Sequence, residues 1–169
     1  MKSSTKRPWV AAGRNVGGLM RVLFCVDGSE GADRALAQGA AWLRNAGMQA
    51  VVLHVIPEVD ERLRHYERLH ESELRQIEDL FGHEGHGLEV AVQARDRLKQ
   101  LGLEADRKVR QGDPAEEILA EIRGGAYDLV VLGSDATGRV EEPRLGSVAE
   151  RVVREGQASV LVVRTGKTG

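Results

Sequence analysis

Residues 21–29 read RVLFCVDGS, a continuous apolar run that ends in a turn signal. An unbroken apolar run of this length is typical of a short strand that is buried on both faces of a sheet. Asp27, Gly28 and Ser29 end the strand, and small apolar residues then recur at helical spacing. Because Ser29 or Asp27 can cap a helix N-terminus, the stretch predicts a strand, a tight turn and a helix.

The rest of the chain repeats this alternation. Four more strands are predicted at residues 50–56, 103–110, 127–132 and 159–163. Segments with helical periodicity lie between them, one of which begins at Asp113-Pro114 and the last at Gly146-Ser147. Such an order predicts an α/β fold: an open, doubly wound sheet of five parallel strands with helices on both faces.

Two segments between the strands are less regular. Residues 58–81 form a long charged stretch with one apolar stripe at helical spacing, which predicts a surface helix. Residues 82–87 (GHEGHG) are predicted to form a polar loop between helices. The strand at 103–110 (LEADRKVR) is charged and only weakly alternating, so we expect it near an edge of the sheet.

The composition is that of an ordinary globular protein. The 169 residues suit one domain, with 41% hydrophobic and 30% charged residues, and the net charge of -2 argues against a nucleic-acid partner. No apolar stretch approaches the roughly 18 residues of a membrane span, and no secretory signal is recognisable. We therefore expect a cytoplasmic protein with a flexible basic arm at 1–19, a domain at 20–165 and a tail at 166–169.

The candidate binding site lies where predicted strands end. In an open doubly wound sheet, ligands bind beyond the carboxyl ends of the strands, where the strand order reverses. The first strand ends in Asp27-Gly28-Ser29, the fourth in Gly133-Ser134, and a helix starts at Gly146-Ser147. Glycines let an anion approach backbone N–H groups closely, and a helix N-terminus adds unpaired donors. The set predicts a phosphate cradle, although each glycine taken singly is also explained as a turn residue.

Several motifs resemble those of the universal stress protein family, over residues 21–164. They are VDGSE at 26–30, LHVIP at 53–57, GDPAEEIL at 112–119, LGSVAERVV at 145–153 and SVLVV at 159–163. The nucleotide signature of that family is Gly, two residues, Gly, nine residues, Gly and then Ser or Thr. Gly133, Gly146 and Ser147 fit this spacing.

The resemblance implies a strand order of 3-2-1-4-5, a homodimer formed through the last strand, and binding of an adenine nucleotide, ATP, with or without Mg²⁺. It also implies roles for individual residues. Asp27 resembles the contact to the adenine or ribose side, Val55 an adenine contact, and Gly112 a glycine near the ribose. The remaining cofactor contacts are implied at the phosphate loop: Leu132, Gly133, Ser134, Gly146, Ser147 and Val148.

The chain departs from the family signature at its second glycine, which is Ala136 here. A Cβ makes a positive φ costly, by roughly 1 kcal/mol, although Gly138 lies two residues on. The charges of Glu141-Glu142 repel a triphosphate, and Arg139 and Arg144 can offset them. The departure keeps two alternatives open: a nucleotide-free dimeric interaction protein of the same fold, and, as a weaker one, a slow ATPase.

Other reactive side chains predict no further site. No nucleophile–base–acid set appears, so no catalytic residue is predicted. Cys25 and His54 lie in buried strands and are interpreted as core residues. His83 and His86 are metal-ligand types, but a polar loop is the favoured interpretation. The Gly-Lys-Thr at 166–168 lacks the preceding glycine and the following helix of a P-loop.

Overall fold

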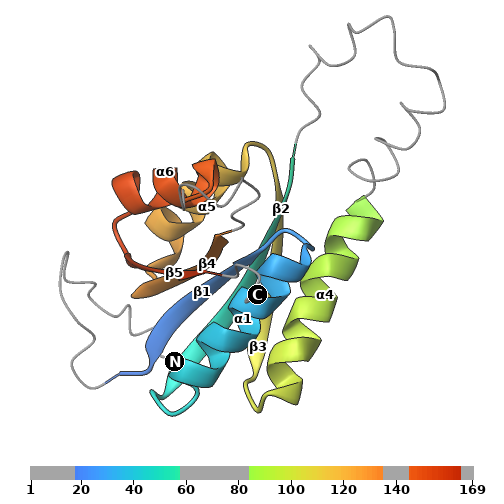
Figure 1. Ribbon diagram of the computed structural model, residues 1–169, viewed down its shortest axis with the longest axis vertical. Helices are drawn as coiled ribbons and strands as arrows, with labels where there is room; N and C mark the ends of the chain where they lie inside the picture. Colours follow the sequence, from blue (N-terminus) through green and yellow to red (C-terminus); the bar gives the residue numbers. More distant parts are fainter. Residues whose placement is uncertain (1–17, 58–83, 135–144, 165–169) are drawn as a thin grey trace, which may run out of the picture.

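The computed structural model describes residues 18–57, 84–134 and 145–164. Within these ranges, five parallel strands form one sheet in the order β3-β2-β1-β4-β5, which confirms the doubly wound fold and the implied strand order (Figure 1). The strands are β1 (Met20–Val26), β2 (Met48–Ile56), β3 (Ala105–Gln111), β4 (Leu129–Ser134) and β5 (Ser159–Arg164). The helices are α1 (Glu30–Leu43), α4 (Glu84–Gln100), α5 (Pro114–Gly125) and α6 (Ser147–Glu155).

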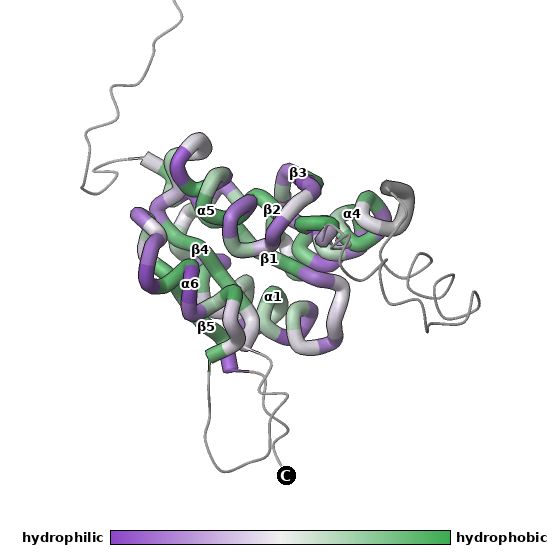
Figure 2. Tube along the Cα trace, turned by 90° about the horizontal axis from the view of Figure 1, so that it is seen from above, coloured by the Kyte–Doolittle hydropathy of each residue, from purple (hydrophilic) through white to green (hydrophobic). Residues whose placement is uncertain are grey.

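Strand β1 lies in the middle of the sheet because the direction of winding reverses around it. The chain runs outward from β1 through β2 to β3, and α5 then leads it back to add β4 and β5 on the other side. Right-handed crossovers place the helices of the two halves on opposite faces of the sheet. Figure 2 shows this arrangement, with α1 and α4 on one face and α5 and α6 on the other.

Each face of the sheet has its own hydrophobic core, because successive side chains of a strand point to opposite faces. On one face, Val22 of β1 belongs to a cluster with Leu36 of α1 and Leu98 of α4. On the other face, Leu23 of β1 belongs to a cluster with Val152 of α6. Both faces of β1 are therefore covered, which explains the continuous apolar run in its sequence.

The ends of three helices carry residues that are typical of helix caps. Ser29 caps α1, since its Oγ accepts a hydrogen bond from the Ala32 N–H at 3.1 Å. Asp113 caps α5 in the same way, by accepting from the Glu116 N–H at 2.9 Å. Gly102 follows α4 with a φ of +83°, the left-handed conformation that favours glycine. These caps set where the helices start and stop relative to the sheet.

Three predicted strands have wrong boundaries. The second strand is predicted at 50–56, but β2 starts two residues earlier, at Met48, because residues 48 and 49 pair with β1. The sequence predicts the fourth strand at 127–132, but β4 starts and ends two residues later, so Gly133 and Ser134 lie in the strand and not in a loop. Both stay in the strand because they pair with the last two residues of β5. The third strand is predicted at 103–110 and is observed as β3, at 105–111, where its residues pair with β2.

The predicted loop at 82–87 is also wrong from Glu84 onward, because α4 begins there. A loop was predicted because the segment is rich in glycine, which has a low helix propensity. The structure shows why glycine stands at position 87 of this helix: a Cβ added there would collide with the Ile56 side chain of β2. The absence of a side chain lets the first turn of α4 lie directly against the sheet.

Three predicted segments lie outside the described residues. They are the charged helix at 58–81, the tail at 166–169, and the basic arm at 1–19 apart from its last two residues. Within the part of the chain that the structure describes, no helix is both long enough and apolar enough to cross a bilayer.

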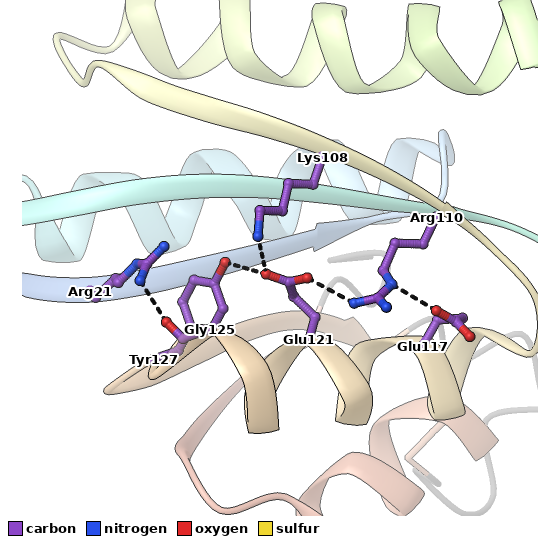
Figure 3. Close-up of polar contacts among 7 residues, drawn as sticks. All are labelled: Arg21, Lys108, Arg110, Glu117, Glu121, Gly125 and Tyr127. Atoms are coloured by element: carbon purple, nitrogen blue, oxygen red, sulfur yellow. Dashed lines mark hydrogen bonds and ion pairs between the residues drawn. The ribbon is translucent and has the colours of Figure 1, made fainter. Parts of the chain in front are cut away.

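A buried carboxylate joins β3 to α5 (Figure 3). The Glu121 side chain is 6% exposed and accepts hydrogen bonds from Lys108 Nζ at 2.5 Å and Arg110 Nη1 at 2.9 Å. Tyr127 Oη donates to the same carboxylate at 2.7 Å, and Arg110 Nε donates to Glu117 Oε2 at 2.7 Å. Because every charge in this network has a partner, the cationic face of an edge strand can pack against a helix.

The network changes the protonation of its members. Burial raises the pKa of Glu121, but hydrogen bonds from Lys108 and Tyr127, with the charge of Lys108, outweigh burial and hold that pKa below its usual value. Burial and the bond to Glu121 raise the pKa of Tyr127. Folding therefore favours an ionised Glu121 beside a protonated Tyr127.

Glu121→Ala is expected to destabilise the fold by about 2–3 kcal/mol, because three donors lose a buried acceptor. The cost stays below that of a fully buried pair, since Lys108 and Arg110 are partly exposed. Glu150→Ala is the matched control: this exposed carboxylate pairs with Arg154, four residues on, and its loss should cost at most about 0.5 kcal/mol. Urea unfolding measures the loss of stability in both variants. Equal losses would contradict the buried role of Glu121.

Acid should weaken the wild-type protein more than Glu121→Gln, which has no carboxyl to titrate. The folded pKa of Glu121 lies below the unfolded value of about 4.3. Its stabilisation is therefore present above that pH and is lost as the pH falls through the folded value. The measurement is the urea midpoint of both proteins between about pH 5 and pH 3. Parallel profiles would show that this pKa is not depressed.

Candidate functional site

A cavity of about 500 Å³ opens at the carboxyl ends of β1, β2 and β4. Its walls are formed by the ends of these strands and by the N-terminal parts of all four described helices. It lies at the switch point of the sheet, where the strand order reverses between β1 and β4. Its position and its volume are those of a small-molecule site in a doubly wound sheet.

The cavity exists because β1 separates from both neighbours before they end. Pairing between β1 and β4 stops at Phe24 and Val131, although β4 continues beside β5 as far as Ser134. Pairing between β1 and β2 stops at His54, and β2 continues for two residues, 55–56, beside β3 alone. The backbone groups of β2 that face this gap have no partner in β1, so they are available to a ligand.

The structure brings seven of the nine residues singled out from the sequence to this cavity. They are Asp27, Val55, Leu132, Gly133, Gly146, Ser147 and Val148. Gly112 and Ser134 are not among the lining residues. Gly112 follows β3 with a φ of +145° and donates its N–H to the Ile56 carbonyl at 3.0 Å, and Ser134 is buried in β4. The ligand contacts of all nine residues stay predictions.

Asp27 shapes the turn that follows β1. Its Oδ1 accepts a hydrogen bond from the Ser29 N–H at 2.9 Å, which closes an Asx turn. Gly28 lies inside the turn with a φ of +84°, a conformation that favours glycine. Asp27 is exposed on the cavity wall. A carboxylate accepts several hydrogen bonds, so Asp27 can also accept one from a ligand hydroxyl or amino group.

The N-terminus of α6 supplies hydrogen-bond donors to another wall. Gly146 is the N-cap and makes no side-chain cap hydrogen bond, and residues 146–149 line the cavity. N–H groups in a first helical turn have no acceptor within the helix and carry the positive end of its dipole. Together with the Ser147 hydroxyl they form a donor set that suits an anion.

Arg151, in the middle of α6, bridges this helix to the start of α5. Its Nη1 lies 3.2 Å from Asp113 Oδ1 and its Nη2 3.1 Å from Glu116 Oε1, both at the N-terminus of α5. The hydrogen bond to Glu116 raises the pKa of Arg151. Because Pro114 of α5 and Ser147 of α6 both line the cavity, this bridge connects two of its walls.

The two glycines of the predicted cradle have different structural roles. A Cβ at Gly133 would lie 3.2 Å from Ala35 Cβ and 3.4 Å from the Gly31 carbonyl oxygen, so this glycine lets β4 pack closely on α1. A Cβ at Gly146 would meet no atom of the described residues within 4 Å. Substitution of Gly146 therefore changes the cavity without a clash in the described fold.

Two side chains on the cavity wall received no ligand role from the sequence. Cys25 lines the cavity as a thiol whose pKa is raised, chiefly by burial. His54 also lines it, and its Nδ1 lies 2.9 Å from the Val26 carbonyl oxygen, which confirms the prediction of a hydrogen-bonded core histidine. The sequence feature that could have identified both residues as part of the cavity wall is their position near the carboxyl end of a central strand.

The described part of the cavity wall carries little charge. Among its lining residues none is lysine or arginine, and Asp27 is the one carboxylate. No group of three metal-ligating side chains occurs in the described residues. The following residues discussed from the sequence lie outside the described ranges: His83, Ala136, Gly138, Arg139, Glu141, Glu142 and Arg144.

Solved structures share this fold. Hypothetical protein MJ0577, of Methanocaldococcus jannaschii, superimposes with a TM-score of 0.65 at 25% sequence identity, over 88% of this chain and 98% of the other. A universal stress protein solved in complex with cAMP superimposes with a TM-score of 0.64 at 20% identity, over 87% of this chain and 98% of the other.

Sequence comparison agrees with the structural one. A universal stress protein from Thermus aquaticus is 33% identical over 145 residues, which cover 85% of this chain and 97% of the relative. A sequence model described as the universal stress protein family matches residues 18–164. This match spans every strand and helix of the sheet described above, and the chain therefore belongs to the universal stress protein family.

Proposed function

We propose that this chain binds an adenine nucleotide, ATP in particular, in the cavity at the switch point, and that it acts as a homodimeric regulatory module. The observation that carries the proposal is one cavity whose walls contain both apolar strand ends and a helix N-terminus with glycine at its N-cap. A nucleotide needs this combination, because its base is flat and largely apolar while its phosphates are anionic.

The strand ends suit the base. Leu53, Val55 and Leu132 supply apolar wall, and the backbone of β2 beyond the end of β1 supplies hydrogen-bonding groups at the same place. Asp27 lies on the wall of the same cavity and can accept a hydrogen bond from a ribose hydroxyl. The N-terminus of α6 then receives the phosphates through residues 146–148 and the Ser147 hydroxyl.

Structural neighbours support the choice of nucleotide. Three universal stress proteins of this fold were solved with cAMP, with dAMP and with AMP. These three ligands share the adenine base and differ in sugar and phosphate. The shared base favours adenine for this chain. These three relatives do not support a triphosphate, so the choice of ATP is part of the proposal itself.

The two edges of the sheet support a homodimer. Edge strand β3 (ADRKVRQ) carries charges along its length, which protect an edge from pairing. Edge strand β5 (SVLVVR) is uncharged up to its last residue, and Val160, Leu161 and Val162 are only half-buried. A second copy of the chain, placed symmetrically against β5, would cover these side chains.

Isothermal titration tests the nucleotide proposal. The wild-type protein should bind ATP at micromolar to millimolar concentration, and Gly146→Val should weaken binding about tenfold or more, because its side chain enters the space of the phosphates. No heat signal at millimolar ATP, with and without Mg²⁺, would refute the proposal and favour the nucleotide-free interaction protein.

Gly124→Val is the matched control for this variant. Gly124 lies in α5 away from the cavity, and its added Cβ would also meet no described atom within 4 Å. It should leave the ATP affinity within about twofold of wild type. Equal losses in both variants would show that a general loss of stability, and not obstruction of the site, weakens binding.

Light scattering after size exclusion tests the homodimer. The wild-type protein should have the mass of two chains at micromolar concentration. Val160→Lys, which places a charge on edge strand β5, should shift it toward the mass of one chain. Val109→Lys on edge strand β3 is the control, since Val109 is 36% exposed and the change should leave the mass unaltered. A monomeric wild type would refute the proposal.

A further inference from the structure

The starts of two helices, α5 and α6, lie at the cavity, and they differ in their caps. Pro114, in the first turn of α5, and Ser147, the first residue of α6, both line the wall. The two helices cover the same face of the sheet (Figure 2). The N-cap of α5 is Asp113, whose carboxylate accepts from the Glu116 N–H, whereas the N-cap of α6 is a glycine. The positive end of the α5 dipole is therefore matched by a carboxylate of that helix's own cap.

Three carboxylates make the start of α5 acidic: Asp113, Glu116 and Glu117. Their charge stabilises the helix, because it lies at the positive end of the helix dipole. For an anion in the same cavity the charge is unfavourable, since Asp113 directly precedes the lining residue Pro114. Glu117 is neutralised by Arg110 of β3, whose Nε lies 2.7 Å from Glu117 Oε2. Asp113 and Glu116 need another cation.

Arg151 of α6 is the cation that faces these two carboxylates. Its Nη1 lies 3.2 Å from Asp113 Oδ1, and its Nη2 lies 3.1 Å from Glu116 Oε1. Its Nε lies 3.4 Å from the carboxylate of Glu155, in its own helix. Within residues 18–57, 84–134 and 145–164, no second cation pairs with Asp113 or Glu116. Loss of Arg151 would leave both carboxylates unpaired beside the cavity.

These charges lie close enough to the start of α6 to act on a ligand there. Arg151 follows Ser147 by four residues, which is about 6 Å along a helix axis. The Debye length is about 8 Å at physiological ionic strength, so screening between the two positions is incomplete. The Arg151 side chain is 38% exposed, so water still moderates the interaction. An interaction of this kind grows with the charge of the ligand, and a packing contact does not.

We propose that Arg151 is a specificity-determining residue that acts through charge: it neutralises the acidic start of α5 and thereby lets the cavity accept several phosphate charges at the start of α6. The inference rests on the nucleotide function proposed above and names the residue on which the preference for a charged ligand depends. Arg151 does not itself line the cavity. It acts on the ligand by cancelling the charge of Asp113 and Glu116, and it makes no contact with the ligand.

A ligand series of graded charge tests this inference. Adenosine, AMP and ATP share base and ribose and differ in the number of phosphates. Arg151→Gln should weaken ATP about threefold to tenfold at low salt, weaken AMP less, and leave adenosine within about twofold of wild type. Isothermal titration at about 20 mM and about 300 mM NaCl measures all three affinities, and the loss for ATP should shrink at the higher salt concentration.

Arg154→Gln is the matched control. It removes the same charge from α6, but Arg154 pairs with Glu150 of its own helix and has no described partner in α5. It should leave the ATP affinity within about twofold of wild type. Asp113→Asn, added to Arg151→Gln, should recover about half or more of the lost binding free energy for ATP, because asparagine still caps a helix and one unpaired carboxylate is removed.

Each outcome decides the inference. If Arg151→Gln weakens adenosine and ATP equally, or if Asp113→Asn gives no recovery, Arg151 only holds two helices together and the inference is overturned. Unchanged ATP binding by Arg151→Gln also overturns it, while the nucleotide function stands. If the wild-type protein binds no nucleotide, both fail together.

Asp113→Asn alone gives a measurement that does not need the Arg151 variant to fold. Because it removes a negative charge beside the cavity, it should tighten ATP about twofold or more and leave adenosine unchanged. ATP binding no tighter than that of wild type would contradict the inference.

Discussion

The pairing of strand β1 with its two neighbours is the constraint on which the rest of the molecule depends. Strand β1 is covered on both faces and paired on both edges, yet its ladders stop at Phe24 on the β4 side and at Val26 on the β2 side. Both neighbours continue further. A sheet whose central strand is the first to end has a gap at that end, and the reversal of winding places helix N-termini around it. The cavity follows from this geometry.

The walls of the cavity are held in place by contacts that lie around it. His54 bonds the carbonyl at the end of β1, the Asp27 turn leads into α1, and Arg151 joins the middle of α6 to the start of α5. Further out, the carboxylate of Glu121 attaches α5 to edge strand β3. These are directional polar contacts between elements whose apolar faces are already packed. Packing brings the helices to the sheet, and the polar contacts define where their ends lie.

The family relationship and the cavity answer different questions. The family match establishes the fold and the ancestry of the chain. The function of a site depends on its own residues, because one fold supports many functions. Here the described wall has one carboxylate, no lysine or arginine and one buried imidazole. A wall of this kind offers apolar surface, hydrogen-bonding groups and the first turn of a helix, and the nucleotide function proposed above rests on these three features.

The sequence by itself determined the fold class and most of the candidate site. Continuous apolar runs report burial on both faces, and the residues after such runs meet at one edge of a parallel sheet, so Asp27 could be named without coordinates. Gly146 was named from the signal of a helix start, and Val55 from the family resemblance. Only the tertiary structure decided that α4 begins in a glycine-rich segment and that Gly133 lies within β4. It also decided that His54 Nδ1 lies against the Val26 carbonyl oxygen. Each of these depends on a partner far away in the chain, and local periodicity carries no information about such partners.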